Sequence, residues 1–131
     1  MNAKKPILCL DFDGVLHSYT SGWQGADVIP DSPVPGAIKF IESASKLFTI
    51  HVYSSRSHQP GGIQAMQVWL WTALMDVIDG DTPVRDVLWF FEIQWPEHKP
   101  PAFLTIDDRA MLFTGKWPHP ADLLDFKPWN K

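Results

Sequence analysis

Four aspartates follow two short apolar runs of the sequence, and their positions carry its clearest chemical signal. They are Asp11, Asp13, Asp107 and Asp108. The first pair comes after residues 7–10 and the second pair after residues 102–106. Runs of this length and composition are typical of strands buried in a sheet. A carboxylate at the end of a buried strand is costly unless another group compensates its charge, so the acids need a partner.

The partner that suits these acids is a hard cation. Two like charges 4 Å apart repel by about 4 kcal/mol at an effective dielectric constant near 20. Because the ligands are all oxygen atoms, without His or Cys at metal-ligand spacing, the sequence predicts Mg²⁺. Mg²⁺ retains open positions for water and phosphate oxygens. A simpler alternative is that Asp13-Gly14 forms only a turn and that Asp11 only ends a strand.

Further polar groups suit such a pocket to a phosphoryl group. Ser54 supplies a hydroxyl, and Lys99 or Arg56 supplies a positive charge. One carboxylate then remains as a nucleophile. His17, His58 and Trp23 could line the entrance, although a packed tryptophan and solvated histidines are the more ordinary interpretation.

The surrounding pattern predicts an α/β fold. Helices are expected over residues 34–46 and from about residue 59 to 78; strands are expected over 7–10, 49–53, 87–93 and 102–106, with a short fifth strand at 111–113. Because the first connection contains a helix, neighbouring strands should be parallel. This order predicts a three-layer α/β/α sandwich around a doubly wound sheet. Ligands bind such sheets beyond the carboxyl ends of the strands, where Asp11, Ser54 and Asp107-Asp108 should meet.

The chain of 131 residues is expected to form a single domain, 1–131, with a flap at about 15–33 and an aromatic, proline-rich tail at about 115–131 packed on the sheet edge. A net charge of −4 gives no general attraction to nucleic acid. Cys9 is the only cysteine, so no internal disulfide can form. No apolar run approaches a membrane span, and the first residues lack an export signal, so a cytoplasmic location is expected.

Four segments taken in order resemble the motifs of the haloacid dehalogenase (HAD) superfamily of phosphohydrolases. They are Leu-Asp-Phe-Asp-Gly-Val at 10–15, Val-Tyr-Ser-Ser-Arg at 52–56, Lys99, and Thr-Ile-Asp-Asp-Arg at 105–109. The first and fourth are specific in combination, whereas the second and third are short. Val15 stands where many members have threonine. The resemblance implies a HAD-type, Rossmann-like sheet. The spacing leaves no room for the cap domain that many members insert.

The resemblance also implies residue roles. Asp11 would be the nucleophile that forms an aspartyl-phosphate and a metal ligand, and Asp13 the general acid/base whose main-chain carbonyl also binds the metal. Asp108 would bind Mg²⁺ directly and Asp107 directly or through water. Ser54, or else Ser55, would bind the phosphoryl group, and Lys99 would neutralise it. Gly14, Ser55 and Arg56 complete the expected substrate contacts.

The expected activity is hydrolysis of a phosphomonoester, and several alternatives remain. The substrate could be bulky or polymeric, such as a nucleotide or a nucleic-acid end contacted by Trp23, Arg56 and His58. A non-catalytic phosphate- or metal-binding module with the same fold is the alternative from another class. A receiver-like phosphoacceptor uses similar groups, but its acidic pair precedes the acceptor aspartate, whereas here it comes last.

Overall fold

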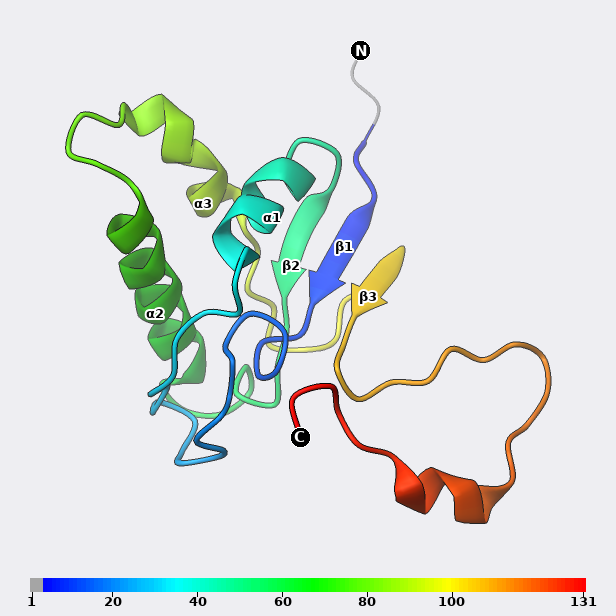
Figure 1. The fold of residues 1–131 in the computed structure, drawn as a ribbon. Coiled ribbons are helices and arrows are strands. Elements are labelled where there is room, and N and C mark those ends of the chain that lie inside the picture. The colour runs from blue at the N-terminus through cyan, green and yellow to red at the C-terminus, as the bar shows by residue number, and fades with distance from the viewer. Residues whose placement is uncertain (1–3) are drawn as a thin grey trace.

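A parallel sheet of three strands forms the centre of the protein (Figure 1). The computed structural model describes residues 4–131; residues 1–3, which belong to the predicted domain and N-terminal segment, lie outside the described part. The strands are β1 (Ile7–Leu10), β2 (Thr49–Val52) and β3 (Leu104–Ile106), in the order β2-β1-β3. Leu10 is in register with Val52 on one side and Ile106 on the other. All three strands therefore end at one edge.

The core lies on one face of this sheet. Leu8 and Leu10 alternate with Cys9 along β1, and their neighbours in register on β2 are Ile50 and Val52. These side chains share one buried cluster with α1 (Ala37–Ala44) and α2 (Gly62–Val77). Burying an aliphatic side chain of this size is worth about 1.5–3 kcal/mol, so the cluster fixes the position of β1 and of the acids that follow it.

The two long helices agree with the sequence-based expectation in type, but α1 is shorter than the predicted 34–46. Gly36 precedes it with a φ of 86°, in the left-handed region. A residue in that conformation cannot continue a right-handed helix, so Pro35 stays outside the first turn. The predicted strand at 49–53 and helix from about 59 to 78 correspond to β2 and α2, with ends that differ by one to three residues.

The strand predicted at 87–93 is wrong. Its residues form the end of a 3₁₀ turn, η1 (Val84–Val87), and a short helix, α3 (Leu88–Glu92). A short run of apolar and aromatic residues fits a buried helix as well as a strand, and here its rings pack on Trp71 of α2. Only Gln94 pairs with the outer edge of β2, where its N–H donates to the carbonyl of Ile50 at 2.9 Å and its carbonyl accepts from Val52 at 3.0 Å.

The C-terminal part also differs from the prediction, because residues 111–113 form no strand. They belong to an extended segment that leaves β3, passes through the 3₁₀ helix η2 (Pro120–Asp125) and returns toward the strand ends (Figure 1). Trp117 and Leu124 are 85% and 88% exposed, so most of the tail does not pack on the sheet edge. Trp129 and Asn130 make contact, donating to the carbonyls of Gly14 (2.8 Å) and Ser18 (2.9 Å).

The described chain is thus an α/β fold with a three-stranded parallel sheet and few helices. Residues 95–103, which cross from Gln94 to β3, contain no helix. Residues 15–33 contain no helix or strand and lie near the carboxyl ends of the strands (Figure 1). Within residues 4–131, no helix has both the length and the apolar character needed to cross a membrane.

Candidate metal and phosphate site

Three of the four predicted acids meet at the carboxyl edge of the sheet. Asp11 follows β1, and Asp107 and Asp108 follow β3; one carboxylate oxygen from each lies within 4.8 Å of the others. The N–H of Asp11 donates to the carbonyl of Ile106 at 3.0 Å, which joins the two strand ends. The chain leaves β1 toward β2 but returns to β3 on the other side of β1. The acids therefore lie at a change in the direction of the connections, where open α/β sheets bind ligands.

Crowding of the acids has a clear electrostatic effect. The pKa of Asp11 is raised to about 8, first because its carboxyl is buried and then because Asp107 is negatively charged nearby. A side-chain hydrogen bond that the protonated Asp11 donates to Asp108 contributes in the same direction. Such a shift means that the protein without a cation strongly disfavours a charged carboxylate at this position.

The donor set fits a divalent hard cation. The three oxygens come from residues that directly follow β1 and β3, and the side chain of Asp108 is only 4% exposed. The positive charge nearest Asp108 is Arg109, whose Nε lies 3.9 Å from Oδ2 but whose side chain is 59% exposed, so solvent weakens this pair. Its backbone N–H donates to Oδ1 of Asp107 at 2.8 Å, which orients that carboxylate. Mg²⁺ could be held by Asp11, Asp107 and Asp108.

Gly14 packs directly against this cluster. Its φ is 83°, and a Cβ atom built on it would lie 2.2 Å from Oδ2 of Asp108. No larger residue fits without displacing that carboxylate. The predicted contact between Gly14 and substrate stays a prediction, and the close approach of Asp108 is a separate reason for glycine at this position.

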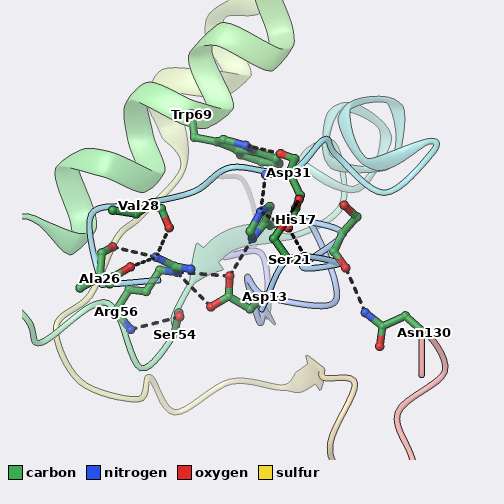
Figure 2. Close-up of polar contacts among 12 residues, drawn as sticks. Asp13, His17, Ser21, Ala26, Val28, Asp31, Ser54, Arg56, Trp69 and Asn130 are labelled. Atoms are coloured by element: carbon green, nitrogen blue, oxygen red, sulfur yellow. Dashed lines mark hydrogen bonds and ion pairs between the residues drawn. The ribbon is translucent and has the colours of Figure 1, made fainter. Parts of the chain in front are cut away.

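The side chain of Asp13 does not join Asp11, Asp107 and Asp108, which we call the acid triad. Figure 2 shows its carboxylate between Arg56 and His17. Nε of Arg56 donates to Oδ1 at 3.2 Å and to Oδ2 at 2.9 Å, while Nδ1 of His17 lies 2.9 Å from Oδ1. The predicted metal contact of Asp13 through its main-chain carbonyl stays a prediction.

Arg56 was expected at the rim of the site, but its side chain is fully buried. Its Nη1 donates to three carbonyls of the flap, those of Gly25, Ala26 and Val28, at 2.7, 2.9 and 3.1 Å. Trp23 covers the guanidinium, with 4.7 Å between the guanidinium carbon and the ring centroid. Nε and Nη1 bind protein groups, whereas Nη2 is buried without a hydrogen-bond partner, so direct contact between Arg56 and a substrate stays a prediction.

His17 is the principal residue that sequence reasoning missed. The interpretation as a solvated histidine is wrong, since the side chain is fully buried. The backbone N–H of Asp31 donates to its Nε2 at 3.0 Å. Nε2 is therefore unprotonated, and Nδ1 carries the hydrogen that is donated to Asp13. Residues four positions apart lie on the same face only in a helix, and the segment from Asp13 to His17 is not helical. The spacing of the two residues therefore could not predict their contact.

The remaining predicted site residues differ in their burial and in their contacts. Ser54 follows β2 and is buried, and its Oγ accepts from the N–H of Arg56 at 3.1 Å, whereas Ser55 is exposed. Lys99 is exposed and forms no ion pair with an acid in the described part of the chain. Its charge does act on the Cys9 thiol, whose pKa is nevertheless raised by burial.

Tyr19 is a further residue at the site that sequence reasoning did not assign. It is the one non-glycine residue with positive φ, 61°, among residues 4–131. Burial and the charge of Asp13 raise the pKa of its hydroxyl, while Arg56 and Arg109 act in the opposite direction. A strained backbone beside charged groups is a feature of functional sites.

Comparisons of the chain with models of known protein families, with curated proteins and with solved structures find no match.

Proposed function

We propose that this protein is a Mg²⁺-dependent phosphomonoesterase that acts through an aspartyl-phosphate on Asp11. The observation that supports this most is the meeting of Asp11, Asp107 and Asp108 within 4.8 Å at the carboxyl edge of a parallel sheet. The likeness of the sequence motifs to those of HAD phosphohydrolases supports the same proposal. By the same likeness, we propose a HAD-type doubly wound sheet without a cap.

In the first half-reaction, a carboxylate oxygen of Asp11 attacks phosphorus. The bond from phosphorus to the leaving oxygen breaks, and Asp13 gives that oxygen a proton. The raised pKa of Asp11 works against this step, since a protonated carboxyl is a poor nucleophile. Mg²⁺, when bound, would stabilise the ionised carboxylates and the charge on the phosphoryl oxygens.

In the second half-reaction, water attacks the phosphorus of the aspartyl-phosphate and loses a proton to Asp13, which releases phosphate and regenerates Asp11. In this step Asp13 acts as the base that its first proton transfer has made available, and its oxygens are held by Arg56 and His17. Ser54 would hold a phosphoryl oxygen, because a hydroxyl that accepts one hydrogen bond can still donate its own hydrogen. Lys99 would have to approach the acids to neutralise the intermediate.

A non-catalytic module that binds phosphate or metal is the second candidate. Such a module would need Asp11, Asp107 and Asp108, but it would not need an Asp13 carboxylate held by hydrogen bonds. The three side-chain hydrogen bonds that fix the Asp13 carboxylate favour the enzyme, because a general acid/base must be held in place to act.

The proposed substrates are large phosphomonoesters, such as nucleotides or nucleic-acid ends. The flap and the residues at Trp129 and Asn130 approach the loop after β1, and no separate domain covers it in residues 4–131. An open site admits a bulky ester but offers few contacts to a small metabolite, and remote contacts are what raise the rate at the reacting centre.

The test is a comparison of kcat/KM for an aryl phosphate, a sugar phosphate and a 3′- or 5′-phosphorylated oligonucleotide, with Mg²⁺ and with chelator. We expect Mg²⁺-dependent turnover that favours the oligonucleotide over the sugar phosphate and is lost in Asp11→Asn. Trp23→Ala should reduce kcat/KM for the oligonucleotide more than for the aryl phosphate. Selective turnover of one small metabolite would contradict the substrate class; Mg²⁺ binding without turnover of any ester would favour the non-catalytic module.

A further inference from the structure

We propose that His17 and Arg56 are positioning residues that connect the Asp13 carboxylate to the flap by hydrogen bonds. The flap must therefore stay in the position seen here for Asp13 to act. The catalytic part of this inference rests on the proposed phosphatase activity. The structural part, the coupling of the flap to Asp13, can be tested without any activity.

Arg56 is anchored from the side of the sheet. Its backbone N–H donates to Oγ of Ser54, directly after β2, at 3.1 Å. Gly62, the first residue of α2, packs so closely that a Cβ atom built on it would lie 1.9 Å from the carbonyl oxygen of Arg56. The backbone of Arg56 is thus held between a strand end and a helix start.

From this anchor the guanidinium binds two groups at once. Nε donates to both oxygens of Asp13, and Nη1 donates to the flap carbonyls of Gly25, Ala26 and Val28. Figure 2 shows the side chain extending between these carbonyls and the carboxylate. Movement of residues 25–28 away from the site would expose a buried cation, and loss of the Asp13 charge would leave it without its counter-ion.

His17 makes the second connection, at another part of the flap. Its Nδ1–H donates to Asp13, and its Nε2 accepts from the N–H of Asp31. The carbonyl of Asp31 in turn accepts from Nε1 of Trp69 on α2 at 3.0 Å. One carboxylate therefore ends two separate chains of hydrogen bonds, which hold the flap at residues 25–28 and at residue 31. Such a doubly fixed carboxylate is preorganised in both position and orientation.

The structural test is hydrogen exchange of the amides of residues 25–31 in two matched variants. Asp13→Asn replaces the carboxylate at the end of both hydrogen-bond chains with an amide. Asp11→Asn makes the same change two residues earlier, at a side chain that takes no part in these hydrogen bonds. We expect exchange in the flap to accelerate at least about tenfold in Asp13→Asn and to change less than about twofold in Asp11→Asn, since local opening determines exchange. Equal exchange in both variants would overturn the coupling. Should Asp13→Asn not fold, His17→Leu tests the same point.

The catalytic test uses three substitutions of His17 with an aryl phosphate as substrate. Asn keeps an N–H near the position of Nδ1, Gln places an amide near Nε2, and Leu retains only bulk. We expect His17→Leu to lower kcat by about 10- to 100-fold, part of the 10²–10⁴ that a general acid/base supplies, with KM changed less than threefold. His17→Asn should recover more of kcat than His17→Gln. Equal kcat in all three variants, or a loss confined to KM, would contradict a positioning role.

The two tests separate the possible failures. A parent protein without turnover would refute the proposed function, but the exchange comparison would still decide whether Asp13 and the flap are coupled. Ser21→Ala is the control for the flap alone, because Ser21 binds the carboxylate of Asp31 and makes no hydrogen bond to Asp13. It should loosen the flap near residue 21 while leaving kcat within about twofold of the parent; a loss as large as that of His17→Leu would mean that any loosening of the flap suffices.

Discussion

At the scale of single residues, the site depends on a few positions where no other side chain serves. Gly14 is one of them, since its backbone is left-handed and its missing Cβ leaves room for the Asp108 carboxylate. Asp11 is another, because burial and two neighbouring acids act on one carboxyl.

Gly14→Ala should disturb the metal site specifically. Gly22 provides the matched control, because its φ of 73° is also left-handed but a Cβ there would meet nothing within 4 Å. Both alanine variants should lose about 1–2 kcal/mol of stability from the left-handed backbone. Only Gly14→Ala should also lose the increase in melting temperature on addition of Mg²⁺. An unchanged Mg²⁺ response in Gly14→Ala would show that Asp108 is not a ligand.

The pKa of Asp11 predicts how stability depends on pH. In the folded protein without metal this carboxyl stays protonated up to about pH 8, whereas its ordinary pKa is 3.8. Between these values unfolding releases a proton, so the contribution of Asp11 to the free energy of unfolding falls as pH rises from about 4 to about 8.

Chemical denaturation across this pH range, in chelator, measures the effect. Asp11→Asn should remove the decline, because the amide does not titrate. Mg²⁺ should weaken the decline in the parent, since a bound cation favours the ionised carboxylates. A parent protein and an Asp11→Asn variant with the same pH profile in chelator would contradict the crowded site.

At the scale of secondary-structure elements, the sequence predicted correctly those segments whose pattern fits only one kind of element. Residues 7–10 are short, apolar and followed by acids, so a buried strand that ends at a polar site was the natural expectation. The aromatic run at 87–93 lacks a distinguishing period, and it became α3 because its rings pack on Trp71. The His17–Asp13–Arg56 connection could not be predicted, since irregular loops bring together residues up to 43 positions apart.

The start of α2 gives a prediction at this scale. Replacing glycine with alanine within a helix ordinarily stabilises it by about 0.5–1 kcal/mol. At Gly62 we expect the opposite sign, a loss of about 1–3 kcal/mol, because the new Cβ would meet the carbonyl of Arg56. Val68→Ala, at an exposed position of the same helix, should change stability by less than about 0.5 kcal/mol. A stabilised Gly62→Ala variant would mean that the loop after β2 moves freely.

At the scale of the whole molecule, the fold collects the candidate site from five parts of the chain. The ends of β1 and β3 bring the acids, the end of β2 brings Ser54 and Arg56, and the flap and the C-terminal residues approach the same edge (Figure 1). Parallel strand order made the first of these predictable from sequence. The sequence predicted that the aromatic tail packs on the sheet edge, but not that only Trp129 and Asn130 bind the loop after β1, because the tail has no periodic pattern.

The central claim is that Asp11 carries the phosphoryl group during turnover. The most direct measurement is rapid acid quench of the protein reacting with an aryl phosphate and Mg²⁺, followed by mass spectrometry of the peptide that contains residues 7–15. We predict the mass of one phosphoryl group on Asp11 in the parent and none in Asp11→Asn or in chelator. Turnover by Asp11→Asn, or steady turnover in the parent with the phosphoryl group found on another residue, would contradict the account.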